Sequence, residues 1–149
     1  MRIEDEIKQK EFKDDYRRLL VNLLFTNNWV NQQVMPFFRR HGLTLQQHNV
    51  LGILRGQHPE PVCFGDIQCR MVDRSSNVTR LIDKLIEKGY ATRDICQANR
   101  RMIEVRLTEK GIRKMQEVDE ASAQLYKQFH NLNQEEAVLV SRMLDKLRG

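Results

Sequence analysis

The sequence has few of the features that mark disulfide-bonded, secreted or membrane-spanning proteins. It holds only 3 cysteines, Cys63, Cys69 and Cys96, an odd number without Cys-x-x-Cys spacing, which argues against a disulfide framework and a zinc knuckle. The richest apolar stretch, Leu19 to Phe25, is too short to span a bilayer, and the charged start MRIEDEIKQK lacks the apolar core of a signal peptide. We therefore expect a cytoplasmic protein with reduced thiols and no membrane contact.

Motifs of catalysis and metal binding are also missing. The sequence contains no GxSxG, P-loop, GxGxxG or HExxH pattern. The histidines His41, His48, His58 and His130 have neither HxxxH nor cysteine-linked ligand spacing. We expect no enzyme activity, no metal ion and no cofactor.

What the sequence does carry is a modest positive charge. There are 25 Lys and Arg against 20 Asp and Glu, for a formal net charge of +5. This balance suits a polyanionic partner without requiring one. A length of 149 residues with 40% apolar composition fits one domain with helical extensions and excludes two large domains.

Periodicity predicts long amphipathic helices at both ends of the chain. Apolar residues recur at three- and four-residue steps from Glu11 to about Phe38, and Pro36 and Gly42 mark the expected end. Near the other end, Thr108 is placed to cap a helix that runs to about residue 130. Asn133 with Glu136 forms a capping box for a last helix over residues 134–147.

The most informative segment is SSNVTRLIDKLIEKG, at residues 75–89. It follows a short predicted helix at about residues 65–72 and a tight turn. Its apolar residues lie at i, i+3, i+4, i+7 and i+8, the spacing of one buried helical stripe: Val78, Leu81, Ile82, Leu85 and Ile86. Ser75 is the expected N-cap, and Gly89 suits the left-handed turn that ends a helix.

A change of period after this helix predicts a β-hairpin. Residues 90–95 have the composition of a strand, and residues 102–107 alternate, with Ile103, Val105 and Leu107 expected inward. The two strands enclose a basic, polar loop. Two short helices, a tight turn and a two-stranded ribbon follow the order of a winged helix-turn-helix, whose second helix enters the major groove of DNA.

The predicted fold class is therefore mainly α with a small β-wing: a winged helix-turn-helix at 44–108, with long N- and C-terminal dimerisation helices at 11–40 and 109–148. The terminal helices carry apolar stripes longer than the small winged segment could cover, and exposed stripes imply a partner. A twofold homodimer is the simplest symmetric assembly that would cover these stripes. It would place two recognition helices about 34 Å apart, one turn of DNA. We expect a homodimer that binds double-stranded DNA.

Four stretches in order resemble the MarR family of transcriptional regulators: LTLQQ at 43–47, NVTRLIDKL at 77–85, the wing at 93–101 and LTEKG at 107–111. The resemblance covers roughly residues 10–148. It implies a dimer with intertwined terminal helices on a pseudo-palindromic operator, usually a repressor released by a ligand or an oxidant. Asn99 departs from the family, whose wing commonly has Asp-x-Arg, so the bracing ion pair is replaced by at most a neutral hydrogen bond.

The architecture and the resemblance together assign DNA contacts to eight residues. Base edges are expected to be contacted by Ser75, Ser76, Asn77 and Thr79, a base or phosphate by Arg80, a phosphate by Lys84, and the minor groove by Arg100 and Arg101. Each of these assignments is a hypothesis about a side chain on the helix at 75–89 or in the wing.

The resemblance also implies a place for a ligand. In the family, small aromatic acids often bind where the terminal helices join the winged segment, which makes Trp29, Phe37, His41 and His48 candidate lining residues. The competing interpretation is that Trp29 and Phe37 are ordinary core or dimer-interface residues.

Two alternative functions remain open from the sequence. The altered wing allows a winged-helix protein-interaction module without specific DNA binding. A thiol-based redox-sensing regulator is the second, because Cys96 lies beside Arg93 and Arg100 and a basic setting lowers the pKa of a thiol. The interpretation that competes with a redox role is that the cysteines are inert small hydrophobic residues.

Overall fold

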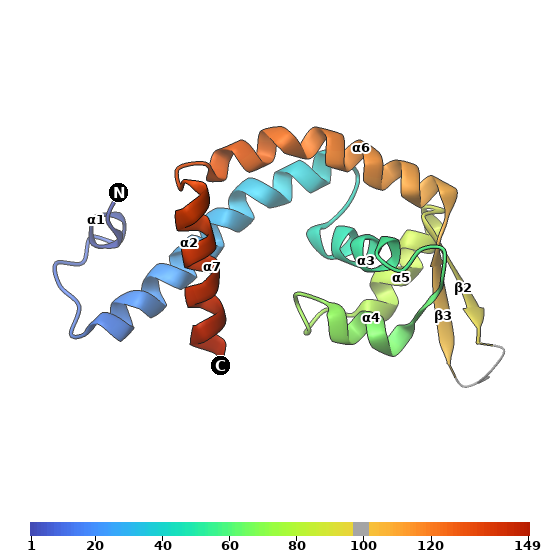
Figure 1. Cartoon of the computed structure of the whole chain (residues 1–149), viewed down its shortest axis with the longest axis horizontal. Coiled ribbons are helices and arrows are strands. Elements are labelled where there is room, and N and C mark those ends of the chain that lie inside the picture. Colours follow the sequence, from blue (N-terminus) through green and yellow to red (C-terminus); the bar gives the residue numbers. More distant parts are fainter. Residues whose placement is uncertain (97–101) are drawn as a thin grey trace. The chain divides into compact units, whose positions relative to one another are not determined.

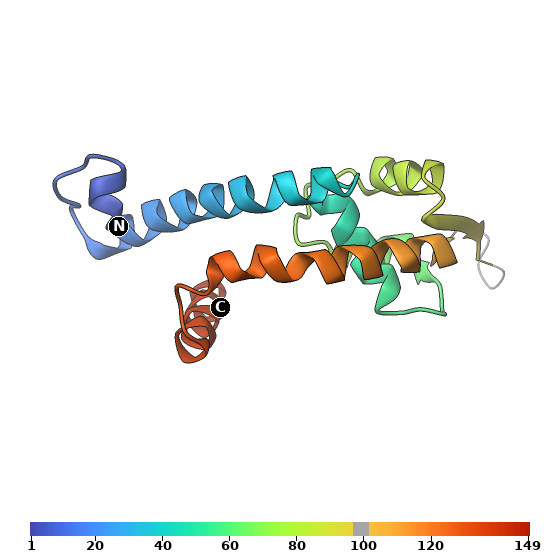
Figure 2. The same cartoon turned by 90° about the horizontal axis from the view of Figure 1, so that it is seen from above.

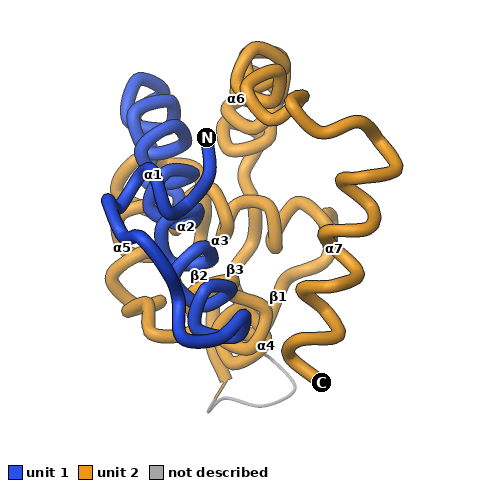
Figure 3. Tube along the Cα trace, turned by 90° about the vertical axis from the view of Figure 1, so that its left-hand side faces the viewer, with its two compact units in different colours: residues 1–45 blue, residues 46–149 orange. Residues whose placement is uncertain are grey.

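A computed structural model describes residues 1–96 and 102–149 of the chain. The described chain divides into two compact units, Met1–Leu45 and Gln46–Gly149, which Figure 3 draws in different colours. It is mostly helical with a small antiparallel sheet, as the periodicity predicted, although the sheet has three strands where two were expected. Within the described ranges, no helix has both the length and the apolar character that crossing a membrane requires.

One long helix, α2 (Asp15–Arg40), dominates the first unit, and Figure 2 shows it as a continuous coil. Asp14 caps its start, because its carboxylate accepts a hydrogen bond from the backbone N–H of Arg17 at 2.9 Å. The helix runs past Pro36, so only Gly42 marks its end as expected. Gly42 has a φ of 70°, the left-handed conformation that glycine adopts without strain.

A short helix that periodicity did not predict, α1 (Ile3–Glu6), precedes α2. Ile3 is buried, and the Glu4 carboxylate accepts a hydrogen bond from Arg18 of α2 at 2.6 Å. That hydrogen bond is the main reason why the pKa of Glu4 is lowered. With only 4 residues, α1 is too short to show a helical period.

Three helices of the second unit form the helix-turn-helix and the helix before it. They are α3 (Leu45–Arg55), α4 (Phe64–Arg70) and α5 (Val78–Glu87), and Figure 1 shows them gathered beside the strands of the wing. Their apolar faces meet in a core whose largest fully buried side chains include Val50, Leu51, Leu54, Ile67, Val78 and Leu85. This burial explains why α5 keeps its polar side outward.

The wing is an antiparallel pair of strands, β2 (Ala91–Ile95) and β3 (Ile103–Leu107), as predicted. A strand that the sequence did not predict, β1 (Val62–Cys63), adds to β3 and gives the order β1-β3-β2. Val105 and Leu107 of β3 are buried as expected, but Ile103 is 43% exposed. Ile103 lies on the same side of β3 as Val105 and Leu107, as predicted, but it is not buried, because the outer half of the hairpin extends beyond the core.

The chain continues into α6 (Glu109–Tyr126), a short 3-10 turn (Lys127–Phe129) and α7 (Gln134–Arg148). Thr108 caps α6, and its hydroxyl accepts a hydrogen bond from the Gly111 N–H at 3.0 Å. The predicted capping box of Asn133 and Glu136 opens α7. No residue of α7 is buried, and five large apolar side chains of this helix are exposed: Val138, Leu139, Val140, Met143 and Leu147.

Candidate nucleic-acid interface

The start of α5 is set by Asn77 and not by Ser75. The Asn77 Oδ1 accepts a hydrogen bond from the Arg80 N–H at 3.1 Å, which is N-cap geometry. The Ser75 N–H and Oγ instead donate to Asp73 Oδ1, at 3.0 and 2.6 Å. The prediction of Ser75 as the cap was wrong because Asp73 holds that serine in the preceding turn, and these hydrogen bonds lower the pKa of Asp73.

The two sides of α5 divide as the periodicity predicted. Val78, Ile82 and Leu85 are buried. Thr79, Arg80 and Lys84 are exposed, and the Lys84 ammonium pairs with Glu87 on the same helix at 2.7 Å. Asn77 and Ser75 are also exposed, whereas Ser76 is only partly so. The first turn of α5 thus presents polar and basic groups on a helix whose opposite side is packed in the core.

Two side chains that sequence reasoning missed hold the turn between α4 and α5. Asn49 of α3 accepts a hydrogen bond from the Val72 N–H through its Oδ1 at 2.9 Å, and Gln68 of α4 donates through Nε2 to the Arg74 carbonyl oxygen at 2.9 Å. A polar residue on a helix carries no local sign of such a role. The turn is therefore fixed by contacts from α3 and α4.

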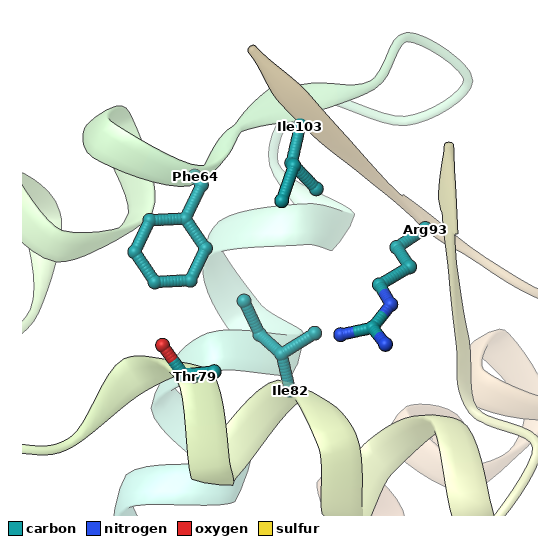
Figure 4. A pocket seen from close by; sticks show the side chains of 5 residues that line it. All are labelled: Phe64, Thr79, Ile82, Arg93 and Ile103. Atoms are coloured by element: carbon teal, nitrogen blue, oxygen red, sulfur yellow. The ribbon is translucent and has the colours of Figure 1, made fainter. Parts of the chain in front are cut away.

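A hollow of about 230 Å³ lies between α5 and the wing (Figure 4). Its walls are Phe64, Ile82 and Ile103, with Thr79 and Arg93 adding a hydroxyl and a cation. In Figure 4 the three apolar side chains point toward one another, and Arg93 reaches from its strand toward the helix. The hollow combines an apolar lining with one positive charge.

The predicted minor-groove residues Arg100 and Arg101, with Asn99, lie outside the described residues. At the described base of the wing, Arg93 Nη1 donates to Asp83 Oδ1 of α5 at 2.8 Å. The described part of the wing therefore has an ion pair to the recognition helix that the sequence pattern did not indicate.

The candidate ligand residues divide between the two units. Trp29 is 37% exposed on α2, whereas Phe37 is buried and its ring lies 4.7 Å from that of His41, centroid to centroid. His48 lies on α3, and burial is the main cause of its lowered pKa. Asp119 acts in the opposite direction, and Arg55 lowers the pKa further. The structure brings Phe37 and His41 together within the first unit.

The three cysteines are free thiols. Burial raises the pKa of the Cys63 thiol, and Asp66, Glu104 and Cys96 add to this shift. A raised pKa reduces the thiolate fraction and hence the reactivity of Cys63. Among the described residues, no group of three or more Cys, His, Asp or Glu side chains is placed to hold a metal ion.

Comparisons with known proteins agree with this geometry. The model of the MarR family matches residues 43–103. The regulator MhqR of Bacillus subtilis is 25% identical over 120 residues, which cover 79% of this chain and 81% of MhqR.

Solved structures extend the likeness to nearly the whole chain. A MarR transcription factor from Planctomyces limnophilus is 27% identical, with a TM-score of 0.71 over 93% of this chain and 98% of that one. A cysteine-to-serine mutant of E. coli MarR in complex with operator DNA is 20% identical, with a TM-score of 0.80 over 93% and 99%. Bordetella bronchiseptica BpsR, whose DNA binding is regulated by 6-hydroxynicotinic acid, is 23% identical, with a TM-score of 0.68 over 86% and 99%.

Proposed function

This chain belongs to the MarR family of DNA-binding transcriptional regulators, and from that premise we propose that it is a repressor that binds a pseudo-palindromic operator as a homodimer. The observation that carries the proposal is the first turn of α5, where Thr79 and Arg80 are exposed on a helix whose other side is buried. Side chains at the start of a recognition helix reach base edges in the major groove. Members of this family are regulators and not enzymes.

The proposed DNA contacts are to bases, to phosphates and to the minor groove, as the sequence suggested. Thr79 would contact a base edge, Arg80 a base or a phosphate, and Lys84, one turn further along, a phosphate. Because the Asn77 Oδ1 serves the cap, its Nδ2 donors are the groups that would reach a base. Ser75 and Ser76 remain proposed base contacts, and Arg100 and Arg101 remain proposed minor-groove contacts.

The second copy of the chain is proposed to cover the apolar residues of the terminal helices. Besides the exposed face of α7, helix α2 exposes Tyr16, Leu19, Leu20 and Leu24. Exposed large apolar side chains that lie together on a helix are characteristic of an interface. A dimer would also pair two α5 helices, as a palindromic operator requires.

Release by a small aromatic acid is proposed as the regulatory step. BpsR provides a relative with an aromatic acid as its effector. Two places in this chain could accept such a molecule: the hollow at Phe64 and Arg93, where the guanidinium would face a carboxylate, and the residues first proposed, Trp29, Phe37, His41 and His48.

The decisive experiment is capture of genomic fragments by the purified full-length protein, with sequencing of what binds. An Arg100→Ala/Arg101→Ala double variant serves for comparison, salt is raised from about 50 to 200 mM, and elution with 6-hydroxynicotinic acid and benzoate follows. The proposal predicts enrichment of a palindromic site, weaker retention by the variant and elution by an aromatic acid. Uniform, salt-labile retention of every fragment would favour a protein-interaction module instead.

The thiol-sensor alternative is tested in the same assay. Treatment with peroxide before capture should leave binding unchanged if the thiols are structural, in keeping with the raised pKa of Cys63. Loss of binding that a reductant restores would establish redox control.

A further inference from the structure

An ion pair connects the recognition helix to the wing. Arg93 Nη1 lies 2.8 Å from Asp83 Oδ1, and both side chains are about half exposed. Asp83 lies in the middle of α5, and Arg93 is the central residue of β2, paired in register with Val105 of β3. The contact therefore acts between two elements, and Figure 4 shows Arg93 extending from its strand toward the helix.

Apolar packing does not fill the space beside this ion pair. The hollow of about 230 Å³ separates Ile82 of α5 from Ile103 of the wing. Ile103 and its cross-strand partner Ile95 are 43% and 64% exposed. Where close packing does not determine the angle between two elements, a directional charge-assisted hydrogen bond can.

The charge of Asp83 makes its location informative. A carboxylate on the helix that approaches DNA repels the phosphates and lowers affinity. Its presence there calls for a role that offsets this cost. Glu87, the other acidic residue of α5, pairs with Lys84 within the helix and joins no second element. Asp83 differs because its partner belongs to the wing.

We propose that Asp83 and Arg93 are positioning residues, which hold the wing at the angle to α5 that operator binding needs. The proposal rests on the DNA-binding function proposed above. Arg93 then acts through Asp83 and not as an independent phosphate contact. For the single substitution Asp83→Asn, the two interpretations predict changes in DNA affinity of opposite sign.

The test measures the affinity of full-length variants for a fragment captured by the wild-type protein and for an unrelated duplex of the same length. Removing the carboxylate with Asp83→Asn should weaken fragment binding by up to about fivefold, the range that loss of an exposed ion pair allows. Arg93→Gln should weaken it by a similar factor, and the double variant no further. The charge-swapped Asp83→Arg/Arg93→Asp protein, with unchanged net charge, should recover most of the loss.

If Arg93 simply contacts a phosphate, Asp83→Asn should tighten binding, Arg93→Gln should reduce the salt slope by about one, and the swap should bind worst. That pattern would overturn the proposal. The matched control is Glu87→Gln, which removes the same charge from the same helix and should leave affinity equal or higher. A loss with Glu87→Gln equal to that with Asp83→Asn would also count against positioning.

The outcome for the wild-type protein separates this inference from the proposed function. If the wild type prefers no fragment, operator binding fails, and the positioning role fails with it. If the wild type is selective and Asp83→Asn binds as well or better, only the positioning role is wrong. Thermal unfolding of each variant checks that its fold is intact, since exposed ion pairs contribute little to stability.

Discussion

At the start of α6, Gly111 packs so closely against its surroundings that no side chain fits. A Cβ at this position would lie 2.3 Å from the Tyr90 carbonyl oxygen and 2.7 Å from Leu107 Cδ1. Gly111→Ala should therefore lower the free energy of unfolding by about 1 to 3 kcal/mol, measured by urea denaturation. Gly52, inside α3, has nothing within 4 Å of such a Cβ, so Gly52→Ala should instead stabilise the protein, by up to about 1 kcal/mol. Equal changes in the free energy of unfolding for Gly111→Ala and Gly52→Ala would contradict this account.

Asn77 combines a cap with a proposed base contact, and two substitutions separate the roles. Asn77→Ala should remove both, with a loss of about 1 kcal/mol in stability and a relaxed sequence preference. Asn77→Ser keeps a capping oxygen without the amide donors, so stability should stay near that of the wild type while sequence preference relaxes. Thermal unfolding and binding to operator variants measure the two effects. Full sequence preference in the serine variant would remove Asn77 from base readout.

At the scale of elements, a charged cluster connects α3 to α6. Arg55 of α3 forms an ion pair with Asp119 of α6, and both affect the pKa of the half-buried His48. Burial is the main cause that lowers this pKa from its ordinary 6.5, so folding favours the neutral imidazole. The resulting stability is present above pH 6.5 and is lost as the pH falls toward the lower folded-state pKa.

The pH dependence of stability should therefore change when His48 is replaced. Between pH 7.5 and 5.5 the urea midpoint of the wild type should fall more than that of His48→Gln, since glutamine does not titrate. The control is His58→Gln, which alters an exposed histidine in the loop after α3 and should follow the wild type. Identical pH profiles for the wild type and His48→Gln would show that His48 makes no such contribution.

At the scale of the whole molecule, the exposed face of α7 bears on assembly. If a second copy covers this face, Met143→Asp would bury a carboxylate at the interface and cost at least about 2 kcal/mol, more than tenfold in the dimer dissociation constant. Sedimentation at micromolar concentration should show a monomer for this variant and a dimer for the wild type. Ser141→Asp places the same charge on another side of α7 and should remain dimeric. A wild-type monomer would contradict the dimer proposal.

Much of the fold is predictable from local patterns. The apolar stripe of α5, the alternation of β3 and the capping box of α7 each depend on residues a few positions apart, and all three appear in the structure. The errors also have local causes. Ser75 and Asn77 are both good caps by composition, and only the hydrogen bonds to Asp73 distinguish them. The strand β1, with 2 residues, is too short to produce a pattern.

The sequence by itself determined the order of the longer helices and of the two hairpin strands, and the polar face that α5 presents, because periodicity and capping are properties of neighbouring residues. Only the tertiary structure decided which polar side chains meet across elements. Asp83 and Arg93 are 10 positions apart, Asn49 and Val72 are 23, and Arg55 and Asp119 are 64. No spacing rule relates such pairs, since their proximity results from how the helices and the wing pack together.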